Sequence, residues 1–84
     1  MSVDERFVAA QTQVKTLTKR PSNDELLSLY SLFKQATDGD VSGKRPGMLD
    51  IRGRAKFDAW KKRKGTTADS AKTQYIALVE RLLG

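Results

Sequence analysis

The chain has 84 residues, of which 38% are hydrophobic and 31% charged, and its formal net charge is +6. This length fits one domain, residues 1–84, and the absence of cysteine and histidine excludes disulfides, thiolate metal sites and histidine-activated nucleophiles. We therefore expect a protein that is not an enzyme and that binds neither a metal nor a cofactor. The apolar runs are too short to span a bilayer and the N-terminus is no secretory signal, so we expect a soluble cytoplasmic protein.

Two capping boxes predict the first two helices. Ser2 and Glu5 form the first, because a hydroxyl and a carboxylate at this spacing satisfy free amides of a first helical turn. Apolar residues then recur at helical spacing: Phe7, Ala10, Val14 and Leu17. Ser22 and Glu25 form the second capping box, and the pattern predicts a helix from there to about Asp38.

Glycines and a proline predict a loop over residues 39–49, followed by two more helices. Asp50 is the expected N-cap of the third helix, although Gly53 should weaken its first turn, and Gly65 should end it. Thr66 is the expected start of the fourth helix. Because no strand alternation is present, the fold class is all-α, a four-helix bundle. The long second connection allows the third helix to run parallel to the second.

The positive charge is concentrated in one quarter of the chain. Residues 44–64 hold nine basic and two acidic side chains, a net charge of +7, so the rest of the chain carries −1. An anionic partner is expected from such a concentration, although a solvated helix face has the same composition. A nucleic-acid-binding module and a membrane-surface module remain alternatives. Pro46, Gly47 and Gly53 interrupt the basic run and no recognition helix is present, so we expect no nucleic acid partner.

Two familiar motifs are incomplete. Asp38 and Asp40 match the first half of a calcium-binding loop, but Leu49 stands where the bidentate glutamate belongs. Residues 39–44 resemble a phosphate-binding P-loop that is one residue too short, with Arg45 in place of the hydroxyl residue. Neither motif therefore predicts a site.

A different group of residues combines cations, hydroxyls and apolar surface. Tyr30 and Lys34 lie four residues apart on the second helix, and Leu27 precedes Tyr30 by one turn. Arg52 and Lys56 have the same spacing on the third helix, and the fourth helix adds a further tyrosine, Tyr75. This pattern fits an amphiphile with a phosphorylated head and an apolar tail. Helical spacing alone does not distinguish it from core tyrosines and surface lysines.

These residues stand in three segments that resemble the acyl-CoA-binding protein family, and the similarity extends over the whole chain. The matching segments are Tyr30–Asp40, Lys44–Trp60 and Lys64–Thr66, with Tyr75. The resemblance implies a bundle in up-down-down-up order that binds medium- to long-chain acyl-CoA with high affinity. It also implies an intracellular carrier that catalyses no reaction.

The resemblance further implies the roles of individual residues. Tyr30, Lys34 and Lys56 would bind the ribose 3′-phosphate, and Phe33, which replaces a tyrosine, would lie by the adenine. The remaining implied contacts are Lys15, Leu27, Arg52, which replaces a lysine, and Tyr75. Gln11 replaces a small alanine, so we expect an effect on acyl-chain length. The implied partners are the acyl-CoA ester, acyl-CoA-using enzymes and, transiently, membranes, and we expect a monomer.

Overall fold

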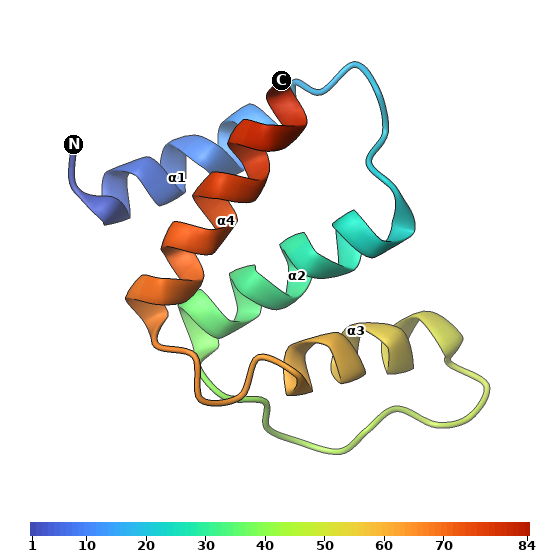
Figure 1. The fold of residues 1–84 in the computed structure, drawn as a ribbon. Helices are drawn as coiled ribbons and strands as arrows, with labels where there is room; N and C mark the ends of the chain where they lie inside the picture. The colour runs from blue at the N-terminus through green and yellow to red at the C-terminus, as the bar shows by residue number, and fades with distance from the viewer.

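The computed structural model describes residues 1–84 as four helices without a strand. The helices are α1 (Val3–Val14), α2 (Asn23–Asp38), α3 (Ile51–Lys61) and α4 (Ala68–Leu83). In Figure 1, α2 and α3 run in the same direction, while α1 and α4 run the other way. The all-α, up-down-down-up bundle is therefore confirmed. None of the helices combines the length and apolar character needed to cross a membrane.

The helix starts follow the predicted caps in three of four cases. Both capping boxes are formed, and the Asp50 carboxylate accepts the backbone N–H of Gly53 at 2.9 Å. The predicted cap of the fourth helix was wrong by one residue. Thr67, not Thr66, is the N-cap, and its hydroxyl accepts the N–H of Ser70 at 3.1 Å. The Thr66 carbonyl lies outside the helix and accepts the Gln35 amide at 2.8 Å.

Two helices end earlier than predicted. α1 ends at Val14, so Leu17 lies beyond it, and α3 ends at Lys61 instead of continuing to Gly65. Gly53 also has a role that its low helix propensity concealed. A Cβ atom at this position would overlap the Asp50 carboxylate, so glycine permits the cap that starts α3.

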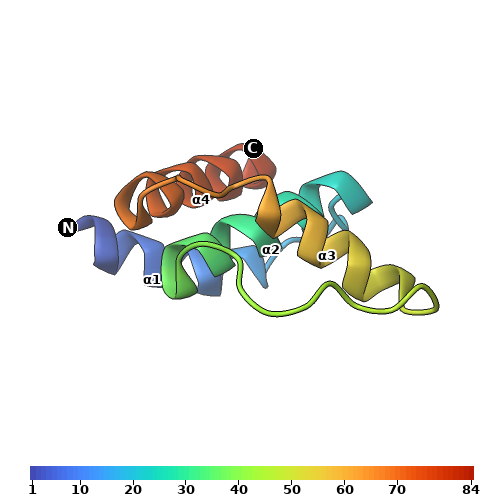
Figure 2. The same cartoon turned by 90° about the horizontal axis from the view of Figure 1, so that it is seen from below.

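α2 and α4 are the two central helices of the packing. They lie against each other, while α1 packs on α4 and α3 packs on α2. Figure 2 shows the resulting flat shape, in which α4 lies over α1 and α2 while α3 extends to the side of α2. Phe7 joins three helices, because its ring lies 5.1 Å from Tyr75, edge to face, and 6.1 Å from Phe33. Helix α3 has the fewest buried residues of the four helices, because Trp60 alone is buried in it.

Side-chain hydrogen bonds compensate by fastening the loops around α3. The Asp40 carboxylate accepts the N–H of Gly65 and the amide of Gln35, both at 2.9 Å. The buried Gln35 amide also donates to the Thr66 carbonyl at 2.8 Å. Asp40 therefore joins the two loops on either side of α3. In the sequence this residue belongs to the incomplete calcium-loop motif, and in the structure its role is to stabilise the fold.

We expect Asp40→Asn to destabilise the fold at neutral pH but not in acid. The hydrogen bonds from Gly65 and Gln35 hold the pKa of Asp40 below its ordinary value of 3.8, so the carboxylate stabilises the folded state above that pH. The difference in unfolding free energy between the two proteins should shrink as the pH falls below 3.8, and it should disappear only once the pH has passed the lower pKa that Asp40 has in the folded protein. Urea titrations followed by Trp60 fluorescence measure it, with Asp69→Asn as the control. A difference independent of pH would contradict the assignment.

Candidate functional site

A groove of about 470 Å³ lies between α2 and α3, next to the end of the α1–α2 connection. Four residues predicted for the site line it: Leu27, Tyr30, Arg52 and Lys56. Five further residues complete the lining: Arg20, Asn23, Leu26, Ile51 and Ala55. The groove thus has an apolar floor and a rim that carries cations.

The Lys56 ammonium lies over the ring of Tyr30, with the nitrogen 5.3 Å from the ring centroid. This cation–π contact holds the two side chains together across α2 and α3. The ammonium is left without a carboxylate partner, so it remains available to an anion. The Tyr30–Lys56 pair therefore places a cation and a hydroxyl on one side of the groove.

Lys34 lies on α2, one turn after Tyr30. Its ammonium lies 4.9 Å from the centroid of the Trp60 ring and forms an ion pair with Asp38. The hydrogen bond to Asp38 raises the pKa of Lys34, and the same contact lowers the pKa of Asp38. Lys34 does not itself line the groove, and an anion that binds it must compete with the Asp38 carboxylate.

Apart from Lys34, three predicted residues lie outside the groove. Tyr75 is only 5% exposed and belongs to the core, where burial raises the pKa of its hydroxyl. Phe33 is half-buried and stacks on Phe7, and Lys15 is the exposed residue that caps the end of α1. The structure therefore brings together Leu27, Tyr30, Arg52 and Lys56. Phe33 of α2 packs toward α1 instead, and Lys15 and Tyr75 also lie outside the groove.

Arg20 lines the groove although it was not among the predicted residues. It lies in the connection before α2, where its guanidinium donates to the Asn23 side chain at 3.5 Å. Helical spacing carries no information on such a residue, because a loop has no period. The only signal in the sequence is its position two residues before the capping box of Ser22.

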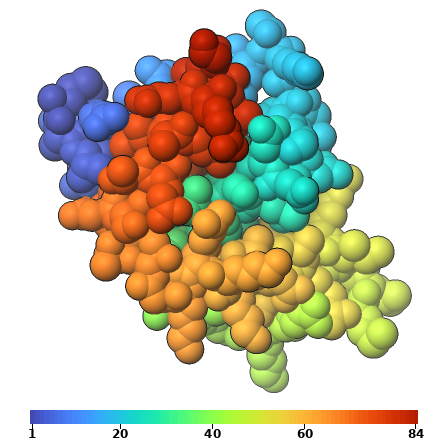
Figure 3. Space-filling view, viewed as in Figure 1, coloured from blue at the N-terminus to red at the C-terminus, as the bar shows by residue number.

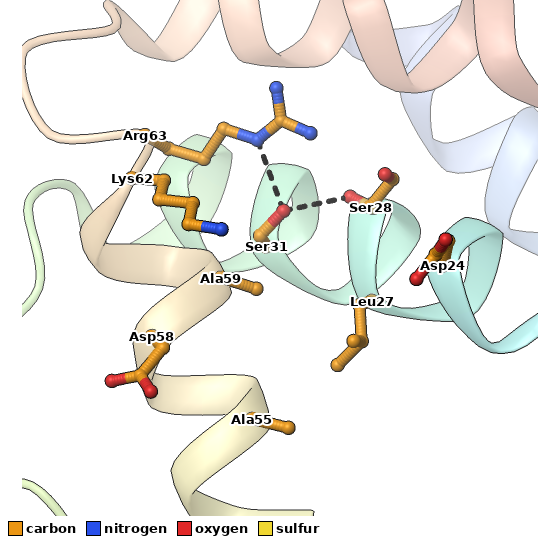
Figure 4. Close-up of a pocket in the computed structure, with 9 residues that line it drawn as sticks. All are labelled: Asp24, Leu27, Ser28, Ser31, Ala55, Asp58, Ala59, Lys62 and Arg63. Atoms are coloured by element: carbon orange, nitrogen blue, oxygen red, sulfur yellow. Dashed lines mark hydrogen bonds between the residues drawn. The ribbon is translucent and has the colours of Figure 1, made fainter.

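A second hollow, of about 520 Å³, opens between the same helices, and Leu27 and Ala55 line both spaces (Figure 4). Its upper part is polar. The Arg63 side chain donates to the Ser31 hydroxyl at 3.1 Å, and that hydroxyl donates to the Ser28 carbonyl at 3.0 Å. These bonds fasten the end of α3 to α2. The hollow has no aromatic ring, so the groove on the Tyr30 side is the better candidate for a ligand.

The basic segment remains largely uncompensated in the folded protein. Of its nine cations, only Arg45 forms an ion pair, through a bidentate contact with Asp58 at 2.7 and 2.9 Å. None of the other eight cations forms an ion pair, and two of them, Arg52 and Lys56, line the groove, where they can attract an anion. The groove is thus suited to a molecule with an anionic head and an apolar tail.

A small helical bundle with a cation-rimmed apolar groove defines a class of protein that binds amphiphiles. The family model described as acyl CoA binding protein matches residues 4–79, and the chain belongs to this family. An acyl-CoA-binding protein homolog of Drosophila melanogaster is 53% identical over 81 residues, which cover 96% of this chain and 94% of the relative.

Solved structures agree with this assignment. The crystal structure of acyl-CoA-binding protein 2 from Oryza sativa superposes with a TM-score of 0.93 at 40% identity, covering 98% of this chain and 91% of that one. The protein from Moniliophthora perniciosa gives a TM-score of 0.89 at 41% identity, with 99% and 81% coverage. These names describe binding proteins, which agrees with the expectation that the chain is not an enzyme.

Proposed function

We propose that this protein binds medium- to long-chain acyl-CoA esters with high affinity and carries them in the cell. The observation on which the proposal rests is the groove between α2 and α3, where Tyr30, Arg52 and Lys56 border an apolar floor. Membership of the acyl-CoA-binding protein family supports the same ligand. No comparison supports the alternative of a nucleic-acid or membrane-surface module.

In this proposal the head group binds to the cations and the acyl chain lies on the apolar floor. Lys56 and Tyr30 bind the 3′-phosphate, and Lys34 joins them after its ammonium exchanges Asp38 for the ligand. Each such charge-assisted hydrogen bond contributes about 1–3 kcal/mol. Arg52 and Leu27 contact the ligand inside the groove.

The three residues outside the groove have supporting roles in the proposal. Phe33 follows Tyr30 by one turn of α2 and offers an aromatic face to the adenine. Lys15 adds a cation from the end of α1, and Tyr75 completes the contacts from α4. Because Tyr75 is buried against Phe7, it can contact a ligand only if the core residues that cover it move.

We further propose that the protein acts as a monomer in the cytoplasm, where it keeps acyl-CoA away from water and from hydrolysis. Its partners are then the acyl-CoA ester itself, acyl-CoA-using enzymes and, transiently, membranes. The ester remains chemically unchanged throughout, and neither a metal nor a cofactor takes part.

Calorimetry with palmitoyl-CoA, coenzyme A and palmitate tests the proposal. We expect tight binding of palmitoyl-CoA and weak binding of the two fragments, because only the ester occupies both the cations and the floor. Lys56→Ala and Lys34→Ala should each weaken binding of the ester by about 5- to 150-fold without loss of fold.

Lys61→Ala is the matched control, since this exposed lysine lies on the same helix as Lys56 but does not line the groove. Equal, weak heats for all three ligands would eliminate the proposal. If Lys34→Ala unfolded the protein, the assignment of Lys34 to the site and not to the core would be wrong.

A further inference from the structure

A third hollow, of about 420 Å³, lies where α2 and α4 meet the residues that follow α3. Four polar residues line it: Ser28, Arg63, Gln74 and Arg81. The rest of the lining is apolar, so the hollow has two positive charges and no acid. We call this space the arginine hollow. In Figure 3 it opens on the face where teal α2, the orange residues after α3 and red α4 come together.

A buried serine holds the guanidinium of Arg63 in place. The Nε–H of Arg63 donates to the hydroxyl of Ser31, which is only 1% exposed, and this hydroxyl is itself fixed by its bond to the Ser28 carbonyl. In Figure 4 the two terminal nitrogens of the guanidinium lie on the side away from Ser31. Arg63 forms no ion pair, so these two nitrogens are oriented but remain available to an anion.

Arg81 adds a second guanidinium from the last turn of α4, and it forms no ion pair either. The acids at the start of α2 do not neutralise the hollow. Glu25 accepts the N–H of Ser22 at 2.8 Å in the capping box, and Asp24 lines the neighbouring hollow instead. Hydrogen bonds with Ser22 lower the pKa of Glu25, and Arg81 adds to this effect without pairing with it. Because two like charges that face one space repel each other, an anion bound between them would stabilise the folded protein.

The polar groups of the hollow fit a phosphate monoester. A guanidinium binds two phosphate oxygens at once, and a phosphate monoester carries about −1.5 to −2 charges at pH 7, which matches the two arginines. The Ser28 hydroxyl can donate to the same oxygens. The Gln74 amide donates to the Ser70 hydroxyl at 3.1 Å, which turns its oxygen toward a hydroxyl of the ligand. The volume exceeds that of a phosphate and leaves room for a short carbon skeleton on the apolar lining.

We propose that the arginine hollow is a second binding site, which takes a small phosphate monoester between Arg63 and Arg81. The site is separate from the groove. Ser28 and Leu32, which line the hollow, stand two residues before and after Tyr30, and at about 100° per residue this places them on the opposite side of α2. The hollow and the groove share no lining residue, so the two sites bind independently and this inference does not rest on the proposed function.

Titration of the full chain with glycerol 3-phosphate, followed by NMR of the backbone amides, tests the inference. We expect the amides of Ser28 and Arg63 to shift together and to saturate. Arg63→Gln and Arg81→Gln should each weaken this binding at least about tenfold, because each removes a charge-assisted contact with the phosphate. Lys61→Gln is the matched control, since it removes the same charge from α3 but lines neither the hollow nor the groove, and it should bind as the wild type does.

The melting temperature gives a second readout. A ligand that binds the folded protein alone raises the Tm, so glycerol 3-phosphate should raise the Tm of the wild type more than sodium chloride at equal ionic strength does. Arg63→Lys keeps the charge but loses the planar fork, and its Tm should rise less than that of the wild type. Circular dichroism checks that each variant is folded. Shifts that do not saturate, or Arg63→Gln and Arg81→Gln variants that both bind as the wild type does, would overturn the inference.

One further variant separates the hollow from the groove, where a phosphate can also meet cations. In Lys56→Ala the amides of Ser28 and Arg63 should respond to glycerol 3-phosphate as in the wild type, because Lys56 lines only the groove. If their response disappeared in this variant, the phosphate would bind in the groove alone and the second site would be wrong. Arg81→Gln should in turn keep the wild-type affinity for palmitoyl-CoA, so the failure of one proposal leaves the other standing.

Discussion

Each methylene added to a medium-length acyl chain should strengthen binding of the CoA ester by up to about fourfold, because burying one methylene contributes about 0.8 kcal/mol. We propose that the chain lies on the apolar lining of the groove, which consists of Leu26, Leu27, Ile51 and Ala55. The gain should level off once the chain extends beyond this floor, since further methylenes stay in water. A series of saturated acyl-CoA esters, measured by calorimetry with free coenzyme A as the reference, gives the slope and the length at which it ends.

In the same experiment, one variant separates the contribution of the apolar floor to binding from that of the cations. Leu27→Ala should reduce the slope with chain length while leaving the affinity for free coenzyme A unchanged, because Leu27 lines the apolar part of the groove. Circular dichroism checks that the bundle is retained. Affinities that do not change along the series would mean that the head group alone binds, and the carrier function proposed for the acyl chain would be wrong.

Trp60→Ala should lower the free energy of unfolding by about 3–5 kcal/mol, which is a large part of the stability of a domain this small. Trp60 is 8% exposed, and its indole N–H donates to the Gly39 carbonyl at 2.8 Å. It therefore holds α3 and the end of α2 together, at the least tightly packed edge of the bundle. The variant loses both the buried ring and this hydrogen bond.

Urea unfolding followed by circular dichroism measures this loss, since the variant contains no tryptophan for fluorescence. Trp60→Phe is the matched control. It keeps an aromatic ring in the same space but loses the indole N–H, so its cost should be smaller than that of Trp60→Ala. If both variants unfolded as the wild type does, α3 would be held by its loop contacts through Asp40 and not by Trp60.

The cations of the basic segment lie in several different places. Arg52 and Lys56 line the groove, where we propose that they meet the ligand, whereas Lys44 lies in the loop before α3. The cations that follow α3 do not line the groove. The cations of the basic segment extend from a loop through α3 to the next turn. This distribution does not favour a single surface that binds a nucleic-acid duplex.

Local signals in the sequence were sufficient for the helices. The capping boxes at Ser2 and Ser22 and the acidic cap at Asp50 connect residues three apart, so they form whatever the rest of the chain does. The ends of the helices were less certain. Neither the end of α1 at Val14 nor the start of α4 after Thr67 follows from the apolar pattern, because the loops compete for the same backbone groups.

The sequence by itself determined an all-α domain, its family and a set of cations and tyrosines at helical spacing, since these depend on contacts within one turn and on short strings of residues. Only the tertiary structure decided which of them meet. It pairs Tyr30 with Lys56, while Tyr75, equally plausible as a ligand contact, lies in the core against Phe7. It also commits Lys34 to Asp38 and Trp60. Which face of a helix meets a neighbour is set by the packing of whole helices and by the loops that join them, and no spacing within a single helix contains that information.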